Sequence, residues 1–188
     1  MAIGQILNPS AAMAADIAGP GPDAGVLDGK VVGIRVDEIW RCWDQITELW
    51  ANEFRAAGAT VRFWRCSQGR TGAEGERIAA SLEEFLQGID IALVGLANCG
   101  SCTGWTVRDA ISAAHKGLPT TAVCTENFVE LSQALSRRGG RSGLRLHILP
   151  YPLNECDQEQ VEAVAREHLP GILQTMGAQA SAVLEQAV

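Results

Sequence analysis

Short apolar runs alternate with longer helical segments along the chain, and this alternation restricts the fold more than any other feature. The runs are rich in Val, Ile and Leu, as are strands that are buried on both faces of a sheet. Strands that alternate with helices join in parallel through right-handed crossovers. We therefore predict an α/β fold, a doubly wound, flavodoxin-like three-layer sandwich with a mostly parallel sheet of about five strands. The predicted strands are residues 30–36, 59–67, 89–98, 120–125 and 144–149.

Helices are predicted between these strands. In the first of them, apolar side chains recur at spacings of three and four residues, which places them in one stripe along a helix. Trp43 and Trp50 belong to this stripe and are expected in the core, whereas Trp40 lies off it. Pro170 is expected to bend the last helix. The predicted helices are residues 38–57, 74–87, 105–116, 126–138 and 157–176, and the stripe consists of Ile39, Trp43, Ile46, Trp50 and Phe54.

The domain organisation is predicted to be simple. Residues 1–28 are rich in Ala, Gly and Pro, which favours an irregular N-terminal arm with a short strand at Gln5–Leu7. Residues 29–188 are predicted to form a single α/β domain, because a chain of 188 residues suits one domain.

Charge and hydropathy exclude several classes of partner. The net charge of -7 disfavours binding to nucleic acid, which needs a basic surface. No apolar run reaches the roughly 18 residues of a membrane span, and the N-terminus has no basic segment followed by a compact apolar one, as a secretory signal would. We therefore expect a cytoplasmic protein without a membrane partner. A homo-oligomer is expected because most soluble oligomers are symmetric dimers.

A Cys-x-x-Cys motif stands at the end of the most apolar predicted strand and just before a helix. Cys99, Gly100, Ser101 and Cys102 form it. The free N–H groups of a helix N-terminus favour an anion, and cysteines in such turns commonly have a lowered pKa. The placement predicts Cys99 as the activated sulfur and Cys102 as its resolving partner.

Two other interpretations of the motif stay open. The spacing can arise by chance in a chain with six cysteines, or it can be half of a zinc site. Structural zinc usually needs a second close pair of ligands, and the other cysteines form none, although Cys124 could join the motif as a third ligand. These other cysteines are Cys42, Cys66, Cys124 and Cys156. No metal is assigned.

Ligands of doubly wound proteins bind at the carboxyl ends of the strands, and this rule selects the remaining candidates. Glu126 is a candidate general acid or base. Arg41 could hold a carboxylate through its planar guanidinium, and Tyr151 could close one wall of the site. A capped helix start, a solvated arginine and a buried strand cysteine are the structural alternatives for these positions. The candidate substrate-binding residues are Asp37, Trp40, Arg41, Ser101, Thr103, Cys124 and Tyr151.

The segment VGLANCGSCTGWTVRDAISAAHKGLPTTAVCTENF resembles the core of the UGSC family, which is named for a Sec-Gly-Ser-Cys motif with cysteine in place of selenocysteine in many members. The resemblance covers about residues 28–155 and places Cys99 at the selenocysteine position. The family is in turn distantly similar to the B-type subunits of glycine, betaine and proline reductases. That similarity implies attack by Cys99 in the reductive cleavage of a carbon–nitrogen bond, followed by a disulfide with Cys102.

Three functions follow from these residues. The first is a thiol-dependent reductase of a small molecule, which has no bound cofactor and is regenerated by an external dithiol or a thiol reductant protein. No glycine-rich dinucleotide fingerprint follows a predicted strand. The second is covalent catalysis by Cys99 without net redox change, as a lyase, hydrolase or isomerase. The third is a non-catalytic partner subunit, because five Trp residues in one chain favour an interface.

Overall fold

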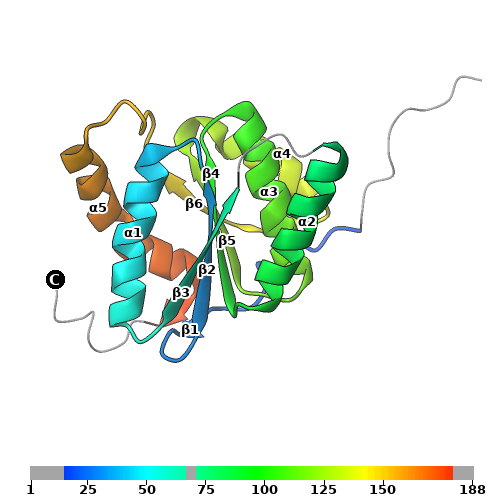
Figure 1. Ribbon diagram of the computed structural model, residues 1–188, viewed down its shortest axis with the longest axis horizontal. Helices are drawn as coiled ribbons and strands as arrows, with labels where there is room; N and C mark the ends of the chain where they lie inside the picture. Colours follow the sequence, from blue (N-terminus) through cyan, green and yellow to red (C-terminus); the bar gives the residue numbers. More distant parts are fainter. Residues whose placement is uncertain (1–14, 67–70, 180–188) are drawn as a thin grey trace, which may run out of the picture.

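The computed structural model describes residues 15–66 and 71–179, so the predicted strand at Gln5–Leu7 lies outside the described residues. A parallel sheet forms the centre of the molecule, with strand order β3-β2-β4-β5-β6 (Figure 1). This order belongs to the flavodoxin-like class of doubly wound sheets, which confirms the predicted fold. The strands are β2 (Val31–Asp37), β3 (Thr60–Cys66), β4 (Ile91–Ala97), β5 (Thr120–Thr125) and β6 (Arg145–Leu149).

Helices cover both faces of the sheet. Figure 1 shows α1 and α5 on one face and α2, α3 and α4 on the other. Their bounds are α1 (Arg41–Ala56), α2 (Gly72–Gln87), α3 (Gly100–His115), α4 (Val129–Arg138) and α5 (Gln158–Met176). Every residue of the central strand β4 is buried, because helices pack on both of its faces.

The core between the sheet and the α1–α5 layer is built around two tryptophans. Trp43 and Trp50 are buried as predicted, and their rings meet edge to face with centroids 5.8 Å apart. Trp50 Nε1 donates a hydrogen bond to the Ala165 carbonyl (2.8 Å), which joins α1 to α5. Gly95 of β4 lies against Trp43, and a Cβ at this position would overlap the indole ring. The fold therefore needs glycine here for close approach.

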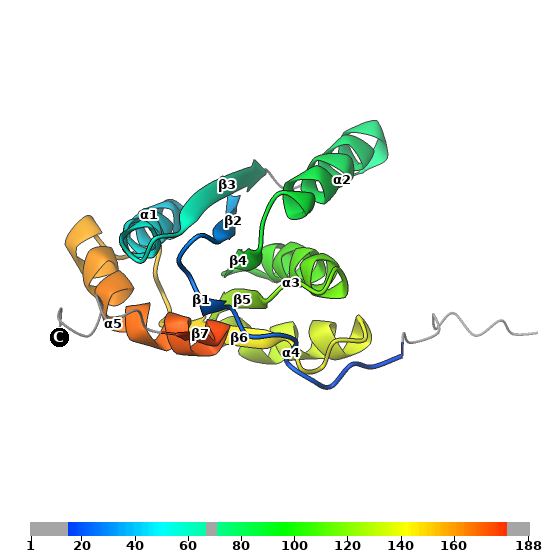
Figure 2. The same ribbon diagram turned by 90° about the horizontal axis from the view of Figure 1, so that it is seen from below.

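A short second sheet joins the N-terminal and C-terminal parts of the described chain. β1 (Gly25–Val26) pairs in parallel with β7 (Ala178–Gln179), and Figure 2 shows the two strands side by side near the end of α5. Residues 15–24 have no regular secondary structure. Asp16 bonds Ser142 and the Ile17 N–H donates to the Gly140 carbonyl, so this irregular segment lies along the loop before β6.

Three predicted helix boundaries are wrong. The first helix begins at Arg41 rather than residue 38, because the backbone at Trp40 is extended, and Ile39 is therefore outside the helix and 50% exposed. The third begins at Gly100 rather than residue 105, since Cys99 itself caps it. The segment predicted as one helix over 126–138 starts with a 3₁₀ turn at Glu126–Phe128 before α4 begins. Pro170 lies inside α5, which continues to Met176.

Candidate active site

The Cys-x-x-Cys motif forms the first turn of α3, at the carboxyl edge of the central strand. Cys99 is the N-cap residue, with an extended backbone (φ -155°, ψ 169°). The backbone N–H of Cys102 donates a hydrogen bond to Cys99 Sγ (3.1 Å). This sulfur therefore takes the place that a Ser or Asp oxygen occupies in an ordinary N-cap. The first turn of α3 contains no acidic residue, so no carboxylate there opposes a negative charge on Cys99.

Cys99 and Cys102 are joined by a disulfide, with their Cα atoms 5.2 Å apart. The two residues differ sharply in exposure. Cys102 is completely buried in the first turn of α3, whereas Cys99 is half-buried at the helix start. Ser101 is exposed, and its Oγ lies 3.4 Å from Cys99 Sγ. A nucleophile from solution therefore reaches the sulfur of Cys99 before that of Cys102.

Thr103 anchors the motif from inside the protein. It is buried, its backbone N–H donates to the Cys99 carbonyl (2.9 Å), and its hydroxyl donates to the same oxygen (2.6 Å). These bonds fix the backbone of Cys99 relative to the helix. The proton of the Thr103 hydroxyl is therefore already donated to a backbone carbonyl of the protein.

A row of polar side chains directly behind Cys99 connects the two neighbouring strands to the β6–α5 connection. The Thr125 hydroxyl at the end of β5 donates to Asn98 Oδ1 (2.9 Å). Asn98 Nδ2 donates in turn to Asn154 Oδ1 (3.2 Å). The strand-end rule covers Asn98 and Thr125, but sequence reasoning gave neither a role in the site and did not select Asn154. The available signal was Asn98 itself, a polar residue at a strand end immediately before the motif.

Asp37 lies in a buried ion cluster on the α3 side of the sheet. Arg35 Nη1 is 2.7 Å from an Asp37 carboxylate oxygen, Arg35 Nε bonds Asp109 of α3 (3.1 Å), and Nη1 also donates to the Gly95 carbonyl (2.8 Å). All three charged residues are at most 2% exposed. Arg35 therefore ties β2 and β4 to the helix that carries the motif. Sequence reasoning missed Arg35, although a charge within an apolar strand was the signal.

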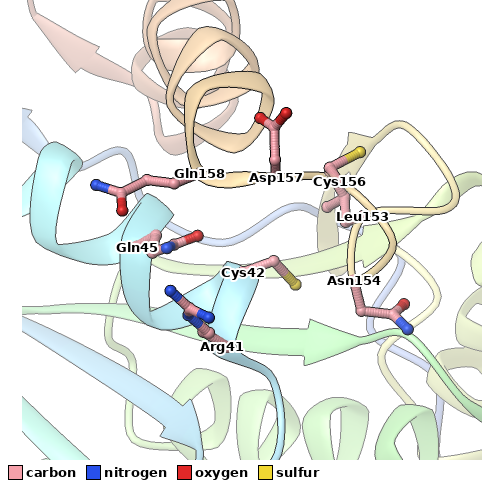
Figure 3. A pocket seen from close by; sticks show the side chains of 8 residues that line it. All are labelled: Arg41, Cys42, Gln45, Leu153, Asn154, Cys156, Asp157 and Gln158. Atoms are coloured by element: carbon pink, nitrogen blue, oxygen red, sulfur yellow. The ribbon is translucent and has the colours of Figure 1, made fainter.

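A pocket of about 320 Å³ opens where the connection before α5 faces the start of α1 (Figure 3). The exposed Arg41 is on its wall, and no side chain in the described part of the chain pairs with this guanidinium. Trp40 precedes it and is half-buried against the core. Asn154 belongs to the same wall, so the polar row behind Cys99 ends at the pocket. The lining residues are Arg41, Cys42, Gln45, Leu153, Asn154, Cys156, Asp157 and Gln158.

The remaining predicted site residues lie at the ends of β5 and β6. Cys124 is 1% exposed inside β5, and burial raises the pKa of its thiol to about 11. Glu126 is exposed in the 3₁₀ turn that follows. Tyr151 is 41% exposed, and its ring meets that of Phe128 edge to face with centroids 6.2 Å apart. Cys124 is therefore a protonated, shielded thiol, while Glu126 and Tyr151 face solvent.

Neither metal-ligand clusters nor membrane-spanning segments were found among residues 15–66 and 71–179. No three His, Cys, Asp or Glu side chains there are grouped as metal ligands. None of the helices in this part of the chain has both the length and the apolar character needed to cross a bilayer.

Comparison with known proteins identified one family. The model described as "UGSC family" matches residues 5–178, nearly the whole chain. The comparisons with curated proteins and with solved structures gave no match.

Proposed function

The chain belongs to the UGSC family, and we propose that it is a thiol-dependent enzyme that acts on a small molecule, with Cys99 as nucleophile and Cys102 as resolving thiol. The proposed reaction is the reductive cleavage of a bond between carbon and a heteroatom, or closely related thiol redox chemistry. The dithiol is the reducing form of the enzyme, and the Cys99–Cys102 disulfide is the oxidised form.

The unequal environment of the two sulfurs carries the proposal. Cys99 is half-buried at the start of α3, where it accepts the Cys102 N–H, and Cys102 is buried within bonding distance of it. In the reduced protein the same N–H and the helix dipole would stabilise a thiolate on Cys99. Attack on a substrate then falls to Cys99, while Cys102 is placed to attack only Cys99.

The proposed cycle balances in atoms and electrons. The Cys99 thiolate attacks the substrate carbon, a carbon–sulfur bond forms, and the bond to the heteroatom breaks as that group leaves with its electron pair and takes a proton. Cys102 then attacks Cys99 Sγ as a thiolate. The disulfide forms, the carbon–sulfur bond breaks, and the carbon keeps the electron pair and is protonated. One dithiol is oxidised for each bond that is reduced, and an external dithiol, either a small molecule or a thiol reductant protein, restores it.

The other candidate residues receive roles from their positions. Arg41, in the pocket wall, is proposed to hold a carboxylate of the substrate with its planar guanidinium. Glu126 is proposed as the proton donor for the released carbon, Ser101 as a hydrogen-bond donor beside Cys99, and Tyr151 as a wall of the site. Three of the candidate substrate-binding residues are buried, and we propose that they support the site without contacting the substrate. These residues are Asp37, Thr103 and Cys124.

The family suggests the finer chemistry. We propose that Cys99 occupies the position of the selenocysteine for which the family is named, and that the likeness to the B-type reductase subunits extends to cleavage of carbon–nitrogen bonds. The cytoplasm, where thiols are kept reduced, stays the predicted compartment.

The experiment that tests this function uses the reduced full-length protein and a panel of small carboxylates that carry an amine at the adjacent carbon. Substrate consumption and thiol oxidation are measured together, and the Cys66→Ser variant is the control because Cys66 is buried in β3, outside the motif. We expect one disulfide per product, no product with Cys99→Ser, and a Cys99 adduct that accumulates with Cys102→Ser.

Two results would contradict this cycle in different ways. Full turnover by Cys102→Ser would show covalent catalysis without net redox change. Absence of both product and Cys99 adduct with every compound of the panel would favour the partner-subunit interpretation instead.

A further inference from the structure

The pocket beside α1 contains two more cysteines, far apart in the sequence, on facing walls. Cys42 is the second residue of α1, and Cys156 lies in the irregular connection between β6 and α5. Both line the pocket, and Figure 3 shows the Cys42 sulfur pointing toward the connection that carries Asn154 and Cys156. Cys42 and Cys156 thus form a second site with two thiols, separate from the motif on α3.

The two thiols differ in accessibility in the same sense as those of the motif. Cys42 is 3% exposed, and burial raises the pKa of its thiol to about 11. A negative charge on Cys156 would raise this pKa further, by less than burial does. Cys156 is half-buried, and its thiol donates to the Pro152 carbonyl (3.3 Å). Cys156 is therefore the thiol that a molecule from solution meets first.

The surroundings allow the two sulfurs to approach. Cys156 belongs to a connection without regular structure between Leu149 and Gln158 and lines the pocket of about 320 Å³, and Figure 3 shows its sulfur pointing away from Cys42. Rotation about its Cα–Cβ bond would move the sulfur from the Pro152 carbonyl into that space. A disulfide needs Cα atoms within about 7 Å of each other, so the irregular connection would have to bring Cys156 within this distance of Cys42. The helix α1 is held in place because Trp50 is hydrogen-bonded to α5.

We propose that Cys42 and Cys156 form a second disulfide by exchange with a low-molecular-weight disulfide, which makes the pocket wall a reversible redox-modification site. The Cys156 thiolate attacks the small disulfide, forms a mixed disulfide and releases one small thiol. Cys42, as a thiolate, then attacks Cys156 Sγ and releases the second. Two protein thiols are oxidised while one small disulfide is reduced to two thiols, and a dithiol reverses the change.

The bond would have a direct effect on the pocket. It would fix the connection that carries Asn154 against the start of α1, which carries Arg41. Asn154 is hydrogen-bonded to Asn98, which precedes Cys99. Oxidation of Cys42 and Cys156 would therefore also affect the residues next to the motif. The inference does not depend on the reaction proposed for Cys99.

The test uses full-length protein with Cys99→Ser and Cys102→Ser, so that only the other four cysteines can react, and oxidised glutathione as the probe. The protein is digested without reduction, and each cysteine peptide is identified by mass spectrometry. We expect a direct link between the Cys42 and Cys156 peptides and no retained glutathione. Addition of Cys42→Ser should abolish the link and leave glutathione on Cys156. Addition of Cys66→Ser or Cys124→Ser, which remove buried cysteines elsewhere, should change nothing.

Three results would overturn the proposal. The first is glutathione retained on Cys156 to the same extent with and without Cys42. The second is failure of Cys156 to react at all. The third is glutathione on Cys42 in the Cys156→Ser variant, which would contradict the proposed order of attack. The sulfur of Cys42 is shielded, so this variant should leave Cys42 unmodified. Circular dichroism of each variant checks that the fold is retained.

Discussion

We predict that His147 makes the stability of this protein sensitive to mild acid. It lies in β6 and is 6% exposed, and its ring is nearly perpendicular to that of Trp50, with centroids 5.9 Å apart. Its Nδ1 is 3.3 Å from Thr175 Oγ1, and its Nε2 is 3.3 Å from Nδ1 of His168. Burial, followed by the charge of the neighbouring His168, lowers the pKa of His147 from 6.5 to about 4. The folded protein therefore holds this imidazole neutral over a range in which the unfolded chain protonates it.

The sign and size of the effect follow from that difference. Between about pH 6.5 and about pH 4 the unfolded chain binds more protons at this position, so the free energy of unfolding falls as the pH falls. Above about pH 6.5 the imidazole is neutral in both states, and the contribution of His147 to the free energy of unfolding is at its maximum. The difference between the two pKa values corresponds to about 3 kcal/mol of this free energy, of which about 2.5 kcal/mol is lost between about pH 7 and about pH 4.5.

The assay is urea unfolding followed by tryptophan fluorescence at these two pH values. The His147→Gln variant keeps a neutral polar side chain but cannot titrate, and His115→Gln, at an exposed position, is the control. Acid also protonates carboxylates, but equally in all three proteins. We expect wild type and His115→Gln to lose about 2.5 kcal/mol more than His147→Gln. Equal losses in all three would refute the reasoning.

Two further predictions concern the framework that holds the motif. Gly95→Ala should destabilise the protein by about 1–3 kcal/mol, because the new Cβ would overlap the Trp43 ring. The control is Gly104→Ala, which should be neutral or stabilising because nothing lies within 4 Å of its new Cβ. Equal shifts of the melting temperature in the two variants would contradict this. Arg35→Met removes the cation of the buried cluster and should cost about 3–5 kcal/mol in urea unfolding. Arg65→Met, which removes a partly exposed ion pair with Asp44, should cost less than about 1 kcal/mol, and a similar loss in both variants would contradict the role assigned to burial.

The fold was predictable because it depends on local patterns that repeat. Alternation of apolar runs with helical segments is visible in the sequence, and it fixes a parallel sheet covered on both faces. The start of α3 was predicted too late because cysteine is outside the usual set of N-cap residues, so Cys99 gave no signal for a helix start. Ile39 was placed on the helix because its spacing fits, but the period continues by chance into the turn before Arg41.

The candidate site was predictable only where it is contiguous in the sequence. Cys99 to Thr103 form one turn, so their neighbourhood follows from the motif itself. Asn154 and Asn98 meet only because the connection after β6 reaches the end of β4, which is separated from β6 by β5, and no local pattern reports that contact. Arg35 was hidden inside a run whose neighbours are apolar, although its charge requires buried partners on another element.

The measurement that tests the central claim most directly is alkylation of the reduced native protein over a range of pH, with mass spectrometry reporting each cysteine peptide separately. We expect Cys99 to react fastest, with an apparent pKa well below the about 8.5 of a free thiol. Cys42 and Cys124, whose pKa values are raised to about 11, should hardly react at neutral pH. A Cys99 that reacts no faster than Cys124 would contradict the assignment of the nucleophile, and with it the proposed function.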